Sequence, residues 1–190
     1  MSDFGPQELL NCYAQGVFPM ADSRDDPSLY LLDPEERGII PLDGLMVSTS
    51  LRKSMRKTPF DIRINHDFLA TVHMCAEQTV ERDNTWINDG IIDLYGHLHT
   101  AGYAHSVECY EGERLVGGLY GVSLGGAFFG ESMVSRRTNA SKIALVKLVE
   151  RLNARGFVLL DTQFMTEHLR SLGGIEITRA QYKQRLNQAL

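Results

Sequence analysis

The stretch AHSVECYEGERLVGGLYGVSLGGAFFGES, residues 104–132, decides the fold class. It contains apolar runs of strand length separated by short links rich in glycine. Glu111-Gly112-Glu113 and Leu124-Gly125 are typical turn sequences, because glycine readily adopts the backbone conformations that tight turns need. The stretch therefore predicts an antiparallel meander. The expected strands span 104–110, 114–122 and 126–132.

A helix and a buried strand are expected directly after the meander. Residues 139–155 carry apolar side chains at helical spacing, with Asn139 or Ser141 as the expected cap and Gly156 as the expected end. Residues 157–161 begin with a continuous apolar run, which predicts a central strand able to pair in parallel. This order predicts an α+β fold with a mixed, mostly antiparallel sheet and flanking helices. It resembles the order of elements in GNAT-type acyltransferase domains.

The remainder of the chain predicts shorter elements. The expected helices span 6–16, 50–57, 67–77, 88–101, 164–172 and 179–189, an alternating segment at 60–64 predicts a strand, and 19–37 reads as an acidic loop.

Composition narrows the class of protein. Hydrophobic residues make up 43% of the chain and charged residues 23%, which is typical of a globular protein. No apolar run reaches the ~20 residues of a membrane helix, and the N-terminus does not read as a signal peptide. The three cysteines are an odd number without a C-x-x-C pair, which favours a reducing compartment, so we expect a cytoplasmic protein. The net charge of −5 means that any RNA binding would need a local basic patch.

One basic patch is visible in the segment 50–57. Arg52, Lys53, Arg56 and Lys57 lie on a predicted helix with no acidic residue between them. Four cations so close together form a compact contact for the phosphates of a tRNA. The alternative is an ordinary solvated helix face.

Several stretches match one protein family. Together they resemble the bacterial leucyl/phenylalanyl-tRNA–protein transferases over nearly the whole chain. They are Tyr13-Ala14-Gln15-Gly16-Val17-Phe18-Pro19, Thr85-Trp86-Ile87, Gly102-Tyr103-Ala104-His105-Ser106-Val107-Glu108, Leu115-Val116-Gly117-Gly118-Leu119-Tyr120-Gly121, Phe129-Gly130-Glu131-Ser132-Met133-Val134-Ser135-Arg136, Asn139-Ala140-Ser141-Lys142 and Leu160-Asp161-Thr162-Gln163.

The resemblance implies an enzyme that takes leucine or phenylalanine from its charged tRNA. It implies transfer of that residue to the N-terminal arginine or lysine of a protein, which marks the protein for N-degron proteolysis. It also implies that no metal or coenzyme is used. The expected partners are aminoacyl-tRNA and acceptor proteins, with no membrane, and we expect a monomer. We divide the chain into an abbreviated N-terminal domain, residues 1–38, and a GNAT-like catalytic domain, residues 39–190.

Asp161 and Gln163 are the expected catalytic residues. They lie at i and i+2 beyond the apolar run, so both side chains point to one face if the strand continues. The resemblance implies that this glutamine contacts the attacking amine and that the aspartate orients it. Because an amide oxygen is a good acceptor but a poor base, we assign alignment of the amine to Gln163 and acceptance of the proton to Asp161. The alternative is that Asp161 caps a helix starting near Phe164.

Glu131 and an apolar pocket complete the expected substrate site. A carboxylate at the end of a strand would hold an ammonium or guanidinium group, the alternative being an ion pair with Arg136. The resemblance implies a pocket for the transferred side chain. Its expected walls are Leu119, Phe128, Met133, Leu145, Leu148 and Leu160. The alternative is that these residues are ordinary core, since an apolar stripe at helical spacing usually is.

Trp86 is the expected platform for the terminal adenine of the tRNA. It is the only tryptophan and follows a polar run, Arg82-Asp83-Asn84-Thr85, which suits a stacking surface. The family often has tryptophan after Phe18-Pro19 and a pair of tryptophans further on. Here Met20 and Tyr30-Leu31-Leu32-Asp33-Pro34 occupy these places. One half of the aromatic clamp is therefore expected to be missing.

Two other functional classes stay open. A GNAT acetyltransferase would cradle the pyrophosphate of acetyl-CoA in a glycine-containing loop at a helix N-terminus. The corresponding stretch here, Ser135-Arg136-Arg137-Thr138-Asn139-Ala140-Ser141-Lys142, contains no glycine. A Cβ atom at that point would keep a pyrophosphate from the backbone, so we expect no coenzyme. The other alternative is a non-catalytic module that binds tRNA or reads degrons.

Overall fold

The computed structural model of the chain describes residues 4–24, 28–57, 60–77 and 85–190. Most of the polar run before Trp86 lies outside these ranges. The described elements are α1 (Pro6–Ala14), β1 (Phe18–Met20), β2 (Tyr30–Leu32), β3 (Glu36–Ile39), α2 (Thr49–Lys57), β4 (Asp61–Ile64), α3 (Phe68–Ala76), α4 (Asp89–Thr100), β5 (Ala104–Glu111), β6 (Arg114–Leu124), β7 (Ala127–Ser135), α5 (Ala140–Ala154), β8 (Leu159–Gln163), α6 (Glu167–Ser171), β9 (Ile175–Thr178) and α7 (Arg179–Ala189).

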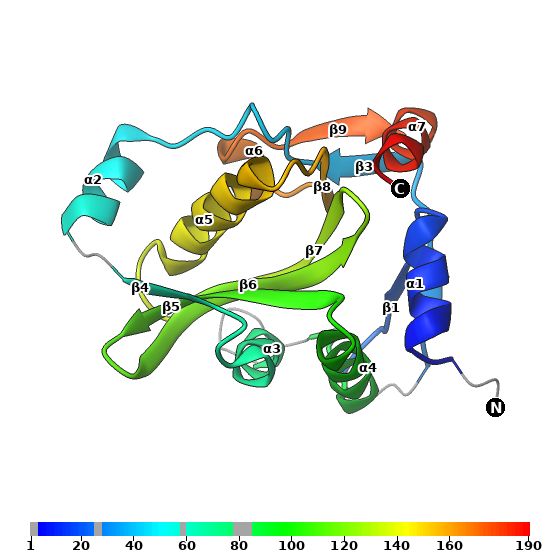
Figure 1. The fold of residues 1–190 in the computed structure, drawn as a ribbon, viewed down its shortest axis with the longest axis horizontal. Helices are drawn as coiled ribbons and strands as arrows, with labels where there is room; N and C mark the ends of the chain where they lie inside the picture. The colour runs from blue at the N-terminus through cyan, green and yellow to red at the C-terminus, as the bar shows by residue number, and fades with distance from the viewer. Residues whose placement is uncertain (1–3, 25–27, 58–59, 78–84) are drawn as a thin grey trace.

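The core of the fold is one large sheet. Within the described ranges, seven strands pair in the order β4-β5-β6-β7-β8-β3-β9, and β1 and β2 form a separate antiparallel pair (Figure 1). In the large sheet, only the pairing of β7 with β8 is parallel. This confirms the predicted α+β fold with a mostly antiparallel sheet and flanking helices; the GNAT-like description stays a prediction.

The predicted meander is confirmed as β5, β6 and β7. Gly112 and Gly125 lie in its two turns with φ values of 60° and 55°, as expected for turn glycines. Gly117 has a different role, because a Cβ atom there would lie 2.5 Å from the Cβ atom of Ala140. The missing side chain lets the start of α5 pack directly on β6.

Helices cover both faces of the sheet (Figure 1). The side chains of α5 share one buried cluster with Leu51 of α2, whereas α1, α3, α4 and α7 contribute to a second cluster on the other face. Burial of each large apolar side chain contributes about 1.5–3 kcal/mol, so these two clusters are the main source of stability. Every helix in the described ranges is too short or too polar to cross a membrane.

The two central strands part at the place where the site lies. The parallel pairing of β8 with β7 runs only from Leu159 opposite Ala127 to Asp161 opposite Phe129. Beyond this point β7 continues to Ser135, while β8 ends at Gln163, whose φ of 57° is in the left-handed region. The side chains that follow on each strand therefore line a pocket between them.

Some predicted elements were wrong. The segment 19–37 was expected to be a loop, but it contains the end of β1, all of β2 and the start of β3. The segment 175–178, for which no element was predicted, forms β9. β3 lies between β8 and β9, so long-range pairing gives this short, charged segment its strand conformation. The expected domain boundary at residue 38 falls inside β3, and the division into two domains stays a prediction.

The start of α5 is capped differently from the expectation. Asn139 occupies the capping position with a φ of 68°, but its side chain makes no capping hydrogen bond. Instead, the backbone N–H of Ser141 donates to Oγ of Ser135 over 2.8 Å. The acceptor for this N–H at the start of α5 is thus a serine from the end of β7, and not the side chain of Asn139 or Ser141, which the sequence predicted as the cap.

Candidate active site

An apolar cavity of about 100 Å³ lies between β7, α5 and β8. Five of the six predicted pocket residues line it, namely Leu119, Met133, Leu145, Leu148 and Leu160. Phe128 does not line this cavity, although it is buried in the same apolar cluster. The cavity lies where β7 and β8 separate, beyond the last paired residues Phe129 and Asp161.

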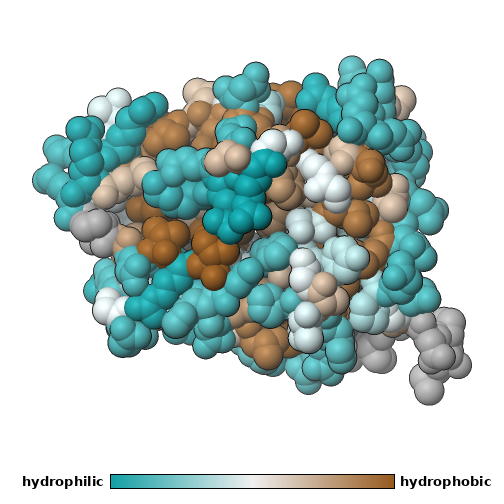
Figure 2. Space-filling model, in the orientation of Figure 1, coloured by the Kyte–Doolittle hydropathy of each residue, from teal (hydrophilic) through white to brown (hydrophobic). Residues whose placement is uncertain are grey.

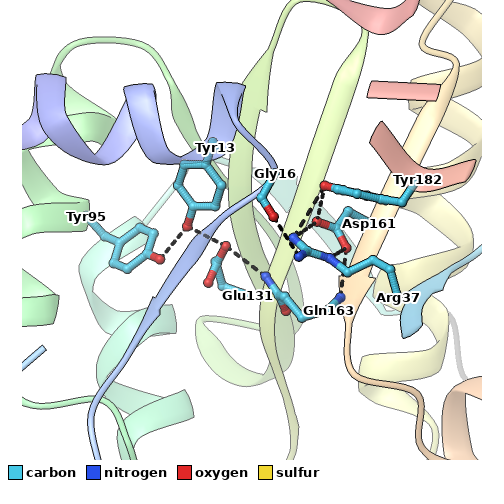
Figure 3. A network of polar contacts seen from close by, with 8 residues as sticks. All are labelled: Tyr13, Gly16, Arg37, Tyr95, Glu131, Asp161, Gln163 and Tyr182. Carbon is cyan, nitrogen blue, oxygen red and sulfur yellow. Dashed lines mark hydrogen bonds and ion pairs between the residues drawn. The ribbon is translucent and has the colours of Figure 1, made fainter. Parts of the chain in front are cut away.

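The polar side chains that line this cavity, here called its rim, include Glu131 from β7 and Gln163 from β8. Figure 3 shows these two side chains pointing toward one another. The side-chain amide of Gln163 donates through Nε2 to Oε1 of Glu131 over 3.1 Å. The hydroxyl of Tyr13 donates to the same carboxylate oxygen over 2.6 Å, and it lies 2.5 Å from the hydroxyl of Tyr95. The rim is therefore a connected hydrogen-bond network that joins α1, α4, β7 and β8.

The carboxyl group of Glu131 is tuned by this setting. Burial raises its pKa from 4.5 to about 7, and the charge of Asp161 acts in the same direction, whereas hydrogen bonds from Tyr13 and Tyr95 act to lower it. Burial and the Glu131 charge likewise raise the pKa of both tyrosines well above the usual value, so they are neutral donors. Glu131 can therefore gain and lose a proton near neutral pH.

The ion pair proposed as an alternative for Glu131 does not form. Arg136, the expected partner, pairs with Glu77 instead. Glu131 therefore faces the cavity, and Arg136 does not neutralise its charge.

Asp161 lies behind the rim in a buried ion pair. Its carboxylate accepts from Arg37 through Nε over 2.9 Å and through Nη2 over 2.7 Å, and both side chains are almost inaccessible, with 1% and 0% exposed. It also accepts from the hydroxyl of Tyr182 and from the backbone N–H of Gln163, each over 2.8 Å. Arg37 in turn donates to the carbonyl of Gly16 over 2.8 Å, which ties the end of α1 to the sheet.

These contacts settle one structural alternative. Asp161 does not cap the following helix, because the side chain of Thr166 caps α6. Asp161 instead holds the backbone of Gln163 in its left-handed conformation, which turns the amide side chain toward Glu131. The sequence placed the two residues together correctly, but the irregular end of β8, and not a continued strand face, brings them to the site.

Two further hollows lie between the pocket and the surroundings of Trp86. The first, of about 340 Å³, shares Glu131 and Gln163 with the pocket and reaches Met20 and Trp86. The second, of about 320 Å³, is lined by Met20, Trp86 and Tyr30 among others. The first hollow therefore extends from the rim of the pocket to Trp86.

Comparison with known proteins decides the family. The model of the leucyl/phenylalanyl-tRNA protein transferase family matches residues 39–187, and the model of its N-terminal domain matches residues 2–35. The chain belongs to this family. A leucyl/phenylalanyl-tRNA--protein transferase of Maricaulis maris (strain MCS10) is 62% identical over all of this chain and 88% of its own length. One of Hyphomonas neptunium (strain ATCC 15444) is 57% identical over 98% of this chain and 72% of its own.

Solved structures add little to this assignment. The structure described as L-PGS from Bacillus licheniformis aligns at 14% identity with a TM-score of 0.44, over 86% of this chain and 55% of that chain. A likeness this weak carries no argument about fold or function. Membership in the leucyl/phenylalanyl-tRNA protein transferase family rests on the sequence matches, and it makes the chain an aminoacyltransferase.

The predicted basic patch lies apart from the pocket of this family member. Arg52, Lys53, Arg56 and Lys57, hereafter the α2 cluster, are all exposed on one short helix. Figure 1 places α2 at the opposite end of the molecule from α1, and Figure 2 shows hydrophilic side chains over it. Within the described ranges, none of the four forms an ion pair, so their charges are available to an external partner.

The sequence missed several residues that the structure places in the site. Arg37 read as part of an acidic loop, and its only signal was its position two residues before the apolar pair Ile39-Ile40. Tyr182 and Tyr95 lie on helices whose partners are set by the tertiary fold, so their sequence context gave no signal. In the part of the chain that the structure describes, no three His, Cys, Asp or Glu side chains are grouped to hold a metal ion.

Proposed function

We propose that this chain transfers leucine or phenylalanine from charged tRNA to the N-terminal arginine or lysine of acceptor proteins, which marks those proteins for N-degron proteolysis. The observation that carries the proposal is the apolar pocket between β7 and β8, with Glu131 and Gln163 on its rim. The pocket suits the side chain of the transferred residue. Moving a leucine or phenylalanine side chain from water into such walls is worth about 1.5–3 kcal/mol, which favours large apolar donors.

The reaction needs little more than alignment and the movement of one proton. The α-amine of the acceptor attacks the ester carbonyl carbon; a C–N bond forms, the bond from that carbon to the ribose oxygen breaks, and the proton lost by the amine ends on the ribose oxygen. With an amine pKa near ~8, roughly a tenth of the acceptor is neutral at pH 7. Alignment of the two substrates supplies much of the remaining rate enhancement.

Gln163 is the residue that aligns the amine in this proposal. Because its Nε2 donates to Glu131 over 3.1 Å, its Oε1 is left to accept an N–H of the amine. Replacement of this amide would therefore remove an acceptor at the rim without changing the charge of the site. The backbone contact with Asp161 fixes the position of Gln163.

In this proposal Glu131, and not Asp161, is the residue that accepts the proton. We expected Asp161 to take the proton, but it already accepts from Arg37, Tyr182 and Gln163 and is fully buried. Its role here is positioning. Glu131 borders the pocket and has a pKa of about 7, which matches a group that takes and returns a proton near neutrality. When ionised, it also attracts a cationic acceptor by a charge-assisted hydrogen bond.

The terminal adenosine is assigned to the hollow beside Trp86. A half-buried indole is a suitable surface for one face of a base, and base stacking contributes about 1–3 kcal/mol. Met20 stands where the family often has tryptophan, yet Tyr30 lines the same hollow. We assign the second aromatic contact to Tyr30, whose hydroxyl donates to Asp22 over 2.8 Å.

The body of the tRNA is assigned to the α2 cluster. The chain carries a net charge of −5, so its RNA affinity has to come from local cations rather than from the overall field. The exposed α2 cluster supplies four such charges on two turns of helix. We further propose that the protein acts as a cytoplasmic monomer; its three free cysteines are compatible with a reducing compartment.

We also propose that the fold is GNAT-like but without the coenzyme. The separation of the parallel strands β7 and β8 supports the first part. At the start of α5, where a pyrophosphate would bind, Oγ of Ser135 already accepts the N–H of Ser141 over 2.8 Å. Because the side chain of Ser135 already occupies this place, we infer that the substrate is not acetyl-CoA.

The direct test is transfer of labelled leucine by the purified chain. The donor is leucyl-tRNA, the acceptor is a peptide that starts with arginine, and the control acceptor is the same peptide with an acetylated N-terminus. The proposal predicts label in the free peptide only. Label in neither peptide, together with tRNA binding, would indicate a non-catalytic module. Tight binding of acetyl-CoA in a calorimeter would support the acetyltransferase class instead.

A further inference from the structure

A second cavity lies on the α5 side of the sheet, away from the rim of Glu131 and Gln163. It has a volume of about 150 Å³. Its polar lining consists of two arginines, a histidine, an asparagine and two serines, and no acidic residue lines it. The residues are Asn65, His105, Ser106, Ser123, Arg151 and Arg155. This composition indicates a ligand with negative charge.

Arg151 and Arg155 supply the charge of this cavity. They lie four residues apart, on α5 and its C-terminal cap, so their like charges repel each other weakly. In the ranges that the structure describes, neither forms an ion pair, whereas Lys147 on the same helix pairs with Glu150 over 2.7 Å. The helix dipole favours positive charge at the C-terminal end of α5, but it does not explain why both arginines line the same cavity.

His105 forms a neutral wall beside the arginines. Its pKa is lowered by burial and then by the charges of His99, Arg151 and Arg155. The side-chain amide of Asn65 lies 3.0 Å from Nδ1, and Nε2 lies 3.1 Å from Oγ of Ser123. A neutral ring that accepts at Nδ1 and donates at Nε2 satisfies both contacts.

The rest of the cavity lining is apolar and borders the pocket between β7 and β8. Phe128, Leu148, Leu152 and Phe157 form this part of the lining, and Leu148 also lines the pocket between β7 and β8. Arg151 and Arg155 are themselves exposed, so an anion can reach both directly from solvent.

We propose that Arg151 and Arg155 together bind one phosphate group of the donor tRNA in this cavity. The proposal rests on the proposed function, because it takes tRNA as the source of the phosphate. Two arginines that line one cavity suit a single phosphate, because each planar guanidinium group can contact a phosphate with two N–H groups. Leu51 of α2 and the core residues of α5 share one buried cluster, so both basic sites belong to the same layer of the molecule.

The test is the salt dependence of tRNA binding. Arg151→Gln, Arg155→Gln and the double variant keep good helix formers at both positions, and Lys147→Gln is the matched control on the same helix. Removal of one phosphate contact lowers the slope of log affinity against log salt by about 0.7–0.9. We expect the slope of the double variant to fall by about this much, Lys147→Gln to bind as wild type, and all four variants to use a minimal leucyl-adenosine donor at the wild-type rate.

Three outcomes overturn the proposal. An unchanged slope in the double variant would mean that the arginines do not contact tRNA, even if inorganic phosphate perturbs the NMR signals of their guanidinium groups. A decrease about twice as large would place the arginines on two separate phosphates rather than in one cavity. Slower use of leucyl-adenosine would point to a structural role. Failure of the proposed function is distinct, because then wild-type protein would transfer no leucine from either donor.

Discussion

Replacement of Glu131 by glutamine should make the protein more stable at high pH while it impairs transfer. Burial raises the pKa of Glu131 from 4.5 to about 7, and this difference corresponds to about 3 kcal/mol. Because the folded-state pKa is raised, the stabilising effect is complete below about pH 4.5 and is lost as the pH rises through about 7. Glutamine stays neutral and keeps an oxygen that can accept from Tyr13, so the variant escapes this loss.

The assay is urea unfolding of wild type and Glu131→Gln at about pH 5 and about pH 8.5, where the linkage relation predicts that the variant gains about 2–3 kcal/mol relative to wild type. Titrations of all other groups cancel in this double difference. The exposed Glu150 on α5 provides the control, since Glu150→Gln should leave the pH dependence as it is. If wild type and Glu131→Gln lose stability in parallel as the pH rises, Glu131 does not ionise near neutrality and its role as proton acceptor fails.

Other substitutions separate alignment, stability and RNA contact. Gln163→Ala should lower kcat of transfer on the order of a hundredfold, and near-normal turnover in a folded variant would remove its aligning role. Asp161→Asn leaves the buried Arg37 without a charged partner and should lower the free energy of unfolding by about 3–5 kcal/mol, measured in urea; a change below that of an average surface mutation would contradict the ion pair. Trp86→Ala should weaken binding of leucyl-adenosine by about 1–3 kcal/mol in calorimetry, and unchanged affinity would end the stacking role. Conversion of the whole α2 cluster to glutamine should lower the salt slope of tRNA binding by about 0.7–0.9 for each phosphate that the cluster binds, and an equal decrease in the use of leucyl-adenosine would instead mark the helix as structural.

The central part of the fold was predictable because local signals and long-range pairing agree there. Alternating apolar residues and turn glycines define β5, β6 and β7, and each strand pairs with its neighbour in sequence. The pocket followed for the same reason, since Leu119 and Met133 face each other across this meander. The resemblance to a family then supplied the roles that an apolar stripe alone does not reveal.

The groups that hold Glu131 and Gln163 in place were not predictable from local sequence. β3 is four residues long and begins with charged residues, and only its pairing with β8 and β9 makes it a strand. Arg37 is buried because Asp161, far away in the sequence, neutralises it. Tyr13 lies on the predicted helix 6–16, but nothing in the sequence showed that its hydroxyl donates to Glu131. Contacts between distant segments carry no periodic signal, so sequence spacing could not place these groups.

Donor selectivity tests the central claim most directly, because the claim is that an apolar pocket beside Glu131 and Gln163 receives the transferred side chain. The measurement is kcat/KM for leucyl-adenosine and for asparaginyl-adenosine, which have side chains of similar shape, with one peptide that starts with arginine. An amide buried among Leu119, Leu145 and Leu148 without a partner costs about 1–3 kcal/mol, so the leucyl donor should be preferred by about tenfold or more. Equal values for the two donors, or a preference for asparagine, would contradict the assignment of the pocket.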